Sequence, residues 1–370
     1  MRVLFTHAGG SGHSDPLVPI AEAMVSAGHV VTETLGYERL ADTEDADTPH
    51  EIAPLRALDM AHEYDVLRDF YAGREARVRA TLILERCAAW KPDVIVCDEV
   101  DFGTMIAAEK LGLPHATVLV TAAGSFVRPD VIAASLDAIR SEHGLPPDPG
   151  VAMPSRHLVV SPFPPTFRDP AFALPPNAHS IRAGSPLEDH LHDTPPWLTP
   201  PSGLPLVYLT LGTVFNTESG DLFERALAGL QELPVEVVVT VGRALDPARF
   251  GPQPAHVHLE RYVPQSLLLP HCDVVVNHGG SGSVVGALAH GVPMVVLPMG
   301  ADQALNAARC QALGVGIALD AARVAPGSIG DAVTAVLETP RYRAAAEGIR
   351  DEIRALPGPE TVVPLLEALA

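Results

Sequence analysis

The stretch RYVPQSLLLPHCDVVVNHGGSGSVVGALAHGVPMVVLPMGADQALN, residues 261–306, decides the fold of the second half of the chain. An apolar strand runs into a glycine-rich turn that opens with His278 and leads into a helical stretch. A second apolar strand over 292–298 follows, and Asp302-Gln303 come shortly after it. A strand, a glycine turn, a helix and another strand in this order predict one unit of a parallel sheet.

The glycine-rich turn has the composition of a phosphate site. Glycines between a strand and a helix leave backbone N–H groups free to point at an anion, and the helix N-terminus adds roughly half a positive charge. His278 can donate a hydrogen bond to the same anion. The other residues that offer backbone or hydroxyl donors are Gly280, Ser281, Gly282 and Ser283.

These motifs resemble the nucleotide-sugar-binding segment of GT-B-fold inverting glycosyltransferases, of the plant UDP-sugar and bacterial antibiotic (macrolide-type, TDP-deoxysugar) family. The resemblance is carried by Pro-Gln at 264–265, His-Gly-Gly at 278–280, Gly-Val-Pro at 291–293, Asp-Gln at 302–303 and Asn306. It extends over most of the chain. It implies an α/β fold of two Rossmann-like doubly wound domains (GT-B) that face an interdomain cleft.

Length, charge and cysteine usage limit the class of protein. The chain has 370 residues, enough for two domains, and no apolar run that predicts a membrane span. The amino terminus lacks the pattern of a secretion signal, and the four cysteines lack metal-site spacing, so we expect a cytoplasmic protein. The net charge of −20 argues against nucleic acid and acidic membranes as partners.

Strands and helices alternate from the amino terminus, which predicts a doubly wound sheet in each half. The resemblance implies an acceptor-binding domain over 1–184 and a nucleotide-sugar domain over 205–355, and the recurring prolines indicate a linker over 185–204. Residues 356–370 are expected as a helix that packs back on the first domain. The clearest expected strands and helices lie at 2–7, 16–27, 30–35, 63–90, 94–97, 102–111, 115–120, 206–211, 222–230, 235–241, 257–259 and 341–356.

His13 is the candidate catalytic base. It lies in the loop between the first strand and the first helix, and a neutral imidazole can take a proton from an acceptor hydroxyl. The resemblance assigns this role to the loop histidine that precedes Pro16-Leu17. A helix-capping or solvent-exposed histidine is the structural alternative, and His7 is a competing candidate.

Asp98 closes the strand 94–97 and matches the aspartate that orients the base in the related plant enzymes. A carboxylate on the far ring nitrogen fixes the tautomer and stabilises the imidazolium. Asp101, three residues on, is an alternative orienting group. Both aspartates precede the helix at 102–111, so either is also a candidate helix cap.

The resemblance assigns further residues to the donor nucleotide. Gln265 matches the position that borders the nucleobase, and Tyr262 or Val263 would contact the base. The tryptophan of the plant enzymes is missing, with Tyr262 or nothing in its place. Thr213, in a second strand-to-helix turn, matches a further phosphate contact. Gly12 is predicted as another residue that binds the donor nucleotide or its phosphates.

Asp302 and Gln303 match the residues that hydrogen-bond to donor-sugar hydroxyls. Plant UDP-sugar enzymes carry a glutamate that binds both ribose hydroxyls at the position of Gly286. A carboxylate is useful against a 2′,3′-diol and less useful against 2′-deoxyribose. Gly286 therefore favours a TDP-sugar over a UDP-sugar.

The resemblance implies no resident cofactor and no metal, with a TDP-sugar or UDP-sugar as co-substrate. The acidic clusters at 98–101 and 44–47 lie away from the phosphate motif, so we interpret them as a helix start and a loop. The expected partners are the nucleotide-sugar donor and a hydrophobic small-molecule acceptor, and a homodimer is a further possibility.

The sequence therefore predicts an inverting glycosyltransferase that moves a deoxysugar from a TDP-sugar to a hydroxyl of a hydrophobic natural product in antibiotic biosynthesis. A UDP-sugar-dependent transferase with another lipophilic acceptor is the nearest alternative. An NDP-sugar epimerase or hydrolase is a second. A non-catalytic auxiliary protein that activates a partner transferase is a third, and the intact His13 and His278 argue against it.

Overall fold

The computed structural model describes residues 1–33, 51–184, 198 and 203–370, which divide into two compact units. Described residues up to 184, except 51–59, form the first unit together with 355–370. Described residues 51–59 and 198–354 form the second. Most of the predicted linker and the whole acidic loop at 44–47 lie outside the described residues.

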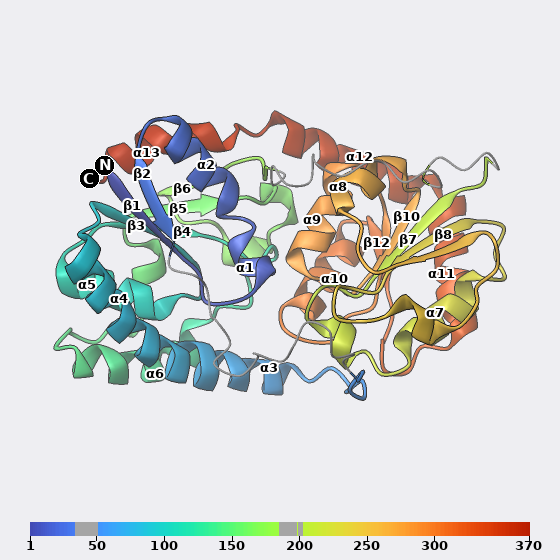
Figure 1. The fold of residues 1–370 in the computed structure, drawn as a ribbon, viewed down its shortest axis with the longest axis horizontal. Coiled ribbons are helices and arrows are strands. Elements are labelled where there is room, and N and C mark those ends of the chain that lie inside the picture. Colours follow the sequence, from blue (N-terminus) through green and yellow to red (C-terminus); the bar gives the residue numbers. More distant parts are fainter. Residues whose placement is uncertain (34–50, 185–197, 199–202) are drawn as a thin grey trace. The chain divides into compact units, whose positions relative to one another are not determined.

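The described residues of the first unit form a six-stranded parallel sheet in the order β2-β1-β3-β4-β5-β6 (Figure 1). Its strands are β1 (Arg2–Thr6), β2 (Val30–Glu33), β3 (Val94–Asp98), β4 (His115–Val118), β5 (Leu158–Ser161) and β6 (Ala178–Ser180). Its longer helices are α2 (Val18–Ser26), α3 (Met60–Val66), η1 (Leu67–Glu75), α4 (Ala76–Trp90), α5 (Phe102–Leu111) and α6 (Pro129–Glu142), and shorter helical segments are α1 (Ser11–Ser14), η2 (Met153–Ser155), η3 (Pro165–Phe167) and η4 (Pro170–Phe172).

Side chains of the first sheet alternate between two buried faces, as expected for parallel strands covered by helices on both sides. Phe5 and Val96 pack with α2 on one face. Leu4 and Ile95 pack with α4 and α5 on the other. The sheet therefore holds the loops at its carboxyl edge on a rigid support.

The last residues of the chain complete the first unit. After α12 (Pro340–Ala355), the segments η10 (Pro359–Val362) and α13 (Val363–Glu367) pack against α2. Val362 and Leu366 are fully buried in the same core as the first strand. The His29 Nε2 and Glu367 Oε1 atoms lie 3.0 Å apart, so the end of the chain is tied to the loop after α2.

The described residues of the second unit form another six-stranded parallel sheet, in the order β12-β11-β10-β7-β8-β9 (Figure 1). Its strands are β7 (Leu206–Thr210), β8 (Glu236–Thr240), β9 (Val257–Glu260), β10 (Val274–Asn277), β11 (Met294–Val296) and β12 (Gly316–Ala318). The helices besides α12 are η7 (Phe215–Glu218), α7 (Leu222–Leu230), η8 (Pro247–Phe250), α8 (Gln265–Leu268), η9 (Leu269–His271), α9 (Ser281–Ala289), α10 (Gln303–Ala312) and α11 (Pro326–Glu338).

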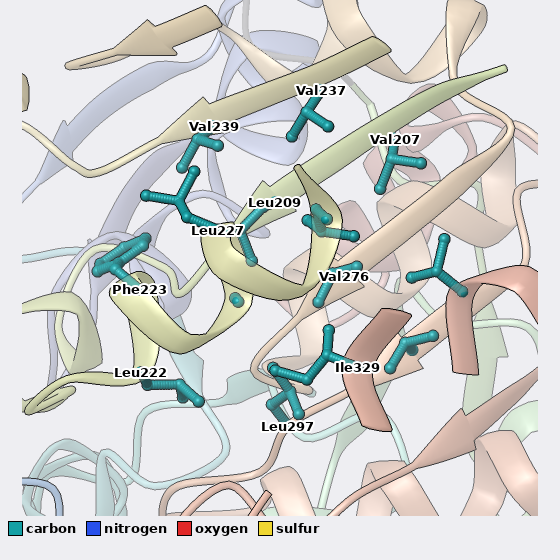
Figure 2. Close-up of a cluster of buried hydrophobic side chains, with 14 of the residues drawn as sticks. Val207, Leu209, Leu222, Phe223, Leu227, Val237, Val239, Val276, Leu297 and Ile329 are labelled. Carbon is teal, nitrogen blue, oxygen red and sulfur yellow. The ribbon is translucent and has the colours of Figure 1, made fainter. Parts of the chain in front are cut away.

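Apolar spacing along α7 explains how the second core forms. Leu222, Phe223 and Leu227 recur at helical intervals and are buried against strand residues such as Val239 (Figure 2). Ile329 from α11 joins the same cluster. Burial of this apolar surface fixes the positions of the strands that carry the phosphate motif.

One predicted boundary is wrong. Residues 51–59 were expected in the first domain, but they belong to the second unit. The N–H of Ala53 donates to the Thr217 carbonyl, and the N–H of Gly220 donates to the Ala53 carbonyl. Ile52 and Leu55 pack on the second core. Apolar side chains without helical or strand periodicity gave no sequence signal for this excursion.

The expected helix over 63–90 is present but not uniform. It starts earlier, at Met60, and residues 67–75 form a π-helical segment, η1, between the α-helical turns of α3 and α4. Widened turns of this kind are rare and frequently occur at functional sites. Hydrophobic periodicity does not distinguish them from an α-helix.

His115 provides a pH test of the first unit. Burial lowers the pKa of His115 to about 4, whereas the unfolded side chain titrates near 6.5. The unfolded state therefore binds more protons between these values, so this contribution to stability is full above pH 6.5 and is lost as the pH falls toward 4. We expect the urea unfolding free energy to drop by about 1–2 kcal/mol more between pH 7 and 5 in the wild type than in His115→Gln. Equal drops would contradict this assignment.

Candidate functional site

The strand order creates one switch point in each sheet. In the first, the chain passes from β1 to β2 on one side and then to β3 on the other side of β1. In the second, it runs outward from β7 through β8 and β9 and then to β10 on the opposite side of β7. Loops that leave adjacent strands in opposite directions open a crevice at the carboxyl edge, where ligands bind in such sheets.

His13 and Asp98 meet at the switch point of the first sheet. His13 belongs to α1, just after β1, and Asp98 is the last residue of β3. The His13 Nδ1 atom lies 3.3 Å from Asp98 Oδ2. Asp98 is fully buried and also accepts the N–H groups of Ala8, at 2.6 Å, and Val100, at 2.7 Å. The carboxylate therefore joins the loops that follow the two strands.

Asp101 has different partners. Arg79 donates two hydrogen bonds to it, at 2.8 and 2.6 Å, and Thr6 Oγ1 donates a third at 2.7 Å. Burial acts to raise the pKa of Asp101, but the Arg79 guanidinium and the hydrogen bonds hold this pKa below its usual value. Asp101 also accepts the Thr104 N–H and so caps α5. The geometry joins the imidazole to Asp98, and Asp101 serves the helix start.

The competing histidine and one residue that the sequence did not indicate lie nearby. The Nδ1 atom of His7 is engaged by the Gly9 carbonyl, 2.7 Å away. Tyr71 from η1 stacks on His13, with ring centroids 6.0 Å apart and planes inclined by 18°. Only the rare π-helical segment brings Tyr71 to this place, so no sequence pattern identified it.

His278 lies at the switch point of the second sheet, directly after β10. It is 8% exposed, and its Nδ1 atom is buried without a hydrogen-bond partner. Burial lowers the pKa of the imidazole to about 4, so the ring is neutral at physiological pH. A neutral ring with an unpartnered polar atom fits a site that is completed by a ligand.

Two glycines lie so close to the His278 ring that neither position has room for a side chain. A Cβ added to Gly212, in the turn after β7, would lie 2.6 Å from the imidazole Cε1 atom. A Cβ added to Gly280 would lie 2.5 Å from Nε2. Gly212 also has a φ of +80°, which disfavours other residues. The two turns thus meet around the imidazole, next to the start of α9.

A hydrogen-bond network links the starts of α9 and α10. Ser281 Oγ donates to Asp302 Oδ2 at 2.7 Å. The fully buried Asn306 donates to the same Asp302 oxygen at 2.9 Å and to the Gly279 carbonyl at 2.9 Å. The sequence indicates Asn306 only as part of the motif, whereas the structure shows that it connects the two helix starts.

Gln303 uses its carbonyl oxygen within the protein. Its Oε1 atom accepts the N–H groups of Met299, at 2.8 Å, and Gly300, at 3.2 Å, and the residue is 2% exposed. Ala301 has a φ of +50°, a strained value for a residue with a side chain. Strain next to Asp302 and Gln303 indicates a loop whose shape is fixed by its surroundings.

The residues predicted to border the nucleobase lie around the start of α8. Val263 is buried, and Gln265 is the first residue of α8. A Cβ added to Gly286 would lie 3.4 Å from Gln265 Oε1, so these two positions are neighbours. Tyr262 is 38% exposed, and the Arg243 guanidinium lies 3.8 Å from the centre of its ring.

The structure brings most predicted donor residues together in the second unit, where Thr213 is exposed and Ser283 is buried at the start of α9. Gly12 instead belongs to the first unit, and its role stays a prediction. Among the described residues, no group of three or more His, Cys, Asp or Glu side chains is arranged to hold a metal ion. None of the described helices is long and apolar enough to cross a membrane.

Comparisons with known proteins agree with this architecture. Residues 224–369 match the family described as "Erythromycin biosynthesis protein CIII-like, C-terminal domain". The chain is 30% identical to 4'-demethylrebeccamycin synthase of Lentzea aerocolonigenes, with 100% of this chain and 99% of that protein covered. It is 28% identical to 3-alpha-mycarosylerythronolide B desosaminyl transferase of Saccharopolyspora erythraea, with 100% and 98% covered.

A solved structure extends the match to the whole fold. Spinosyn rhamnosyltransferase SpnG complexed with thymidine diphosphate superimposes with a TM-score of 0.76 at 25% identity, covering 99% of this chain and 100% of that one. The predicted class of two parallel Rossmann-like sheets is confirmed by this match and by the two sheets described above.

The Gly280 contact gives a test of the predicted phosphate site. Gly280 has an ordinary backbone conformation, so Gly280→Ala is strained only by the 2.5 Å approach of its methyl group to His278 Nε2. We expect the displaced imidazole to weaken TDP binding at least about tenfold in calorimetry. The control is Gly348→Ala on α12, where an added Cβ meets nothing within 4 Å. Unchanged TDP affinity in Gly280→Ala would contradict a role for this contact.

Proposed function

Because the chain belongs to the family of bacterial antibiotic glycosyltransferases that includes the erythromycin CIII-like proteins, we propose that it transfers a deoxysugar from a TDP-sugar to a hydroxyl of a hydrophobic natural product. That it is a glycosyltransferase follows from family membership. The identities of donor and acceptor are the proposal. Self-association stays a prediction.

The main support for a donor site is the buried His278 before the glycine-rich start of α9, because its Nδ1 atom has no hydrogen-bond partner. A helix N-terminus and a neutral imidazole donor are suited to a diphosphate, because they supply N–H groups without the cost of burying a charge. This matters in a chain of net charge −20, which does not attract anions over long range. We propose that these groups stabilise the departing diphosphate without a metal ion.

The preference for a TDP-sugar rests on Gly286. Its α-carbon faces Gln265, the residue proposed to border the nucleobase, so a longer side chain at 286 would lie in the nucleoside region. Glycine leaves no carboxylate for a ribose diol, which suits 2′-deoxyribose. One relative points the same way, because the SpnG structure contains thymidine diphosphate.

The proposed reaction begins at His13. With Nδ1–H directed at Asp98, the lone pair of Nε2 accepts the proton of the acceptor hydroxyl. The acceptor oxygen forms a bond to the anomeric carbon while the bond from that carbon to the diphosphate oxygen breaks. The bonding pair leaves with TDP, and attack from the opposite face inverts the configuration. Positive charge developing on the sugar is expected for glycosyl transfer.

The sugar is proposed to be recognised next to the diphosphate, at Asp302 and Gln303. Asp302 is held by Ser281 and Asn306, which leaves its orientation fixed before the donor arrives. The Gln303 carbonyl is occupied by backbone N–H groups, so its amide nitrogen is the group proposed to face a sugar hydroxyl. Asp302 therefore carries the larger share of sugar recognition in this proposal.

The donor proposal predicts a change in nucleotide preference on substitution of Gly286. We expect the wild type to bind TDP more tightly than UDP in calorimetry. Gly286→Glu should raise the UDP affinity relative to TDP by about tenfold, because a carboxylate can accept both ribose hydroxyls. Gly286→Ala is the control, since its methyl group makes only ordinary contacts at 3.4 Å and adds no acceptor.

The two parts of the proposal fail separately. If the wild type binds UDP as well as or better than TDP, the TDP preference is wrong and the UDP-sugar alternative replaces it. If His278→Ala binds TDP as tightly as the wild type, the diphosphate site itself is wrong.

A further inference from the structure

The hydrogen bond to Asp98 does not by itself fix the His13 ring. At 3.3 Å, the distance from Nδ1 to Oδ2 exceeds the usual range of 2.7–3.2 Å for such bonds. The His13 side chain is also 23% exposed, so solvent reaches it. A base must be held within hydrogen-bond reach of the proton that it removes. Other contacts are therefore needed to orient this imidazole.

Two such contacts surround the ring. A Cβ added to Gly9 would lie 2.2 Å from the His13 Cδ2 atom, so the backbone at Gly9 already bounds the imidazole. Tyr71 stacks on the ring at 6.0 Å between centroids, nearly parallel to it. Gly9 belongs to the same loop as His13 and moves with it. Tyr71 comes from a separate helix and provides the independent support.

The position of Tyr71 depends on the π-helical segment. Successive residues of an α-helix are rotated by roughly 100° about its axis. One residue inserted as a π-helical turn therefore rotates the side chains that follow by about this angle, compared with an uninterrupted α-helix. Tyr71 lies inside η1, where an uninterrupted α-helix would direct its ring elsewhere. The irregularity is thus what brings an aromatic ring to the base.

The helix that carries Tyr71 is firmly anchored. A Cβ added to Gly103 on α5 would lie 2.4 Å from the Ala76 carbonyl oxygen, so α4 and α5 approach at backbone distance. Arg79 of α4 donates to Asp101 at the start of α5 at 2.6 Å, with both side chains buried. Because η1 continues directly into α4, these contacts also fix the position of the Tyr71 ring relative to the His13 ring.

The charge state of Tyr71 suits this place. Burial, and to a smaller extent the nearby Asp98 carboxylate, raises the pKa of the phenol to about 12. The ring therefore stays neutral and adds no negative charge beside Asp98. The electron-rich face of a tyrosine also attracts a cation, so it favours the imidazolium that forms when His13 takes a proton.

We propose that Tyr71 is a positioning residue that acts through His13, holding the imidazole in the orientation in which Nδ1 faces Asp98 and Nε2 points away from that carboxylate. This inference rests on the proposed role of His13 as the base. Tyr71 is assigned no contact with the acceptor and no proton transfer of its own. The aromatic ring carries the effect, and the hydroxyl does not.

The first test is nuclear magnetic resonance of the full chain labelled with 15N-histidine, with His13→Asn used to assign the His13 ring. We expect one Nδ1–H tautomer in the wild type and in Tyr71→Phe, and averaged tautomer shifts in Tyr71→Leu. Tyr71→Met serves as a second variant should Tyr71→Leu not fold. Trp90→Leu, an aromatic loss at the far end of α4, should leave the His13 signals unchanged. Wild-type signals in the folded Leu or Met variant would overturn the proposal.

The second test is a double-mutant cycle, read as TDP release from TDP-glucose with water as the attacking group. We expect Tyr71→Leu to lower this rate about tenfold, Tyr71→Phe to restore it, and Tyr71→Leu to have no further effect in a His13→Asn background. An equal tenfold loss in that background would show that Tyr71 does not act through His13 and would overturn the proposal. A His13→Asn variant as active as the wild type would instead overturn the proposed base, whatever the tautomer spectra show.

Discussion

The rest of the structure depends on the order in which the strands of each parallel sheet are connected. In both sheets the chain starts at an inner strand, moves outward on one side, and then crosses to the other side of its starting strand. The loops after β1 and β3, and those after β7 and β10, are therefore the places where the backbone diverges. His13 and Asp98 occupy the first of these places, and Gly212 and His278 occupy the second. Packing of the two cores fixes the strands, and the strands fix these loops.

The two candidate sites differ in the charge that their groups are suited to stabilise. At the first, a buried carboxylate accepts two backbone N–H groups and faces an imidazole, so it would stabilise the positive charge that His13 gains in its proposed role as base. At the second, burial keeps His278 neutral, and N–H groups at a helix start take the place of full positive charges. Each arrangement reduces the unfavourable free energy of placing a charge in a site that is partly shielded from water. In its proposed role, the arrangement at His278 would let a strongly acidic chain bind an anionic donor.

The sequence predicted the features that depend on local pattern. Parallel strands and the glycine turn at 278–283 follow from apolar runs and glycine spacing, whereas the pairing of His13 with Asp98 is what the family resemblance implies. It did not predict features that depend on packing between distant segments. The π-helical turns that present Tyr71 have ordinary helical periodicity, and residues 51–59 join the second unit through contacts that leave no periodic trace. The choice between Asp98 and Asp101 also needed coordinates, because only these show Arg79 beside Asp101.

The central claim is that the two units have separate roles: the second unit binds the donor nucleotide, and the first supplies the base. The most direct test compares His13→Asn with the wild type in TDP calorimetry and in TDP release from TDP-glucose. The account predicts a TDP affinity within about twofold of the wild type together with a loss of turnover of roughly 10²–10⁴-fold. Loss of TDP binding in His13→Asn, or turnover at the wild-type rate, would contradict it.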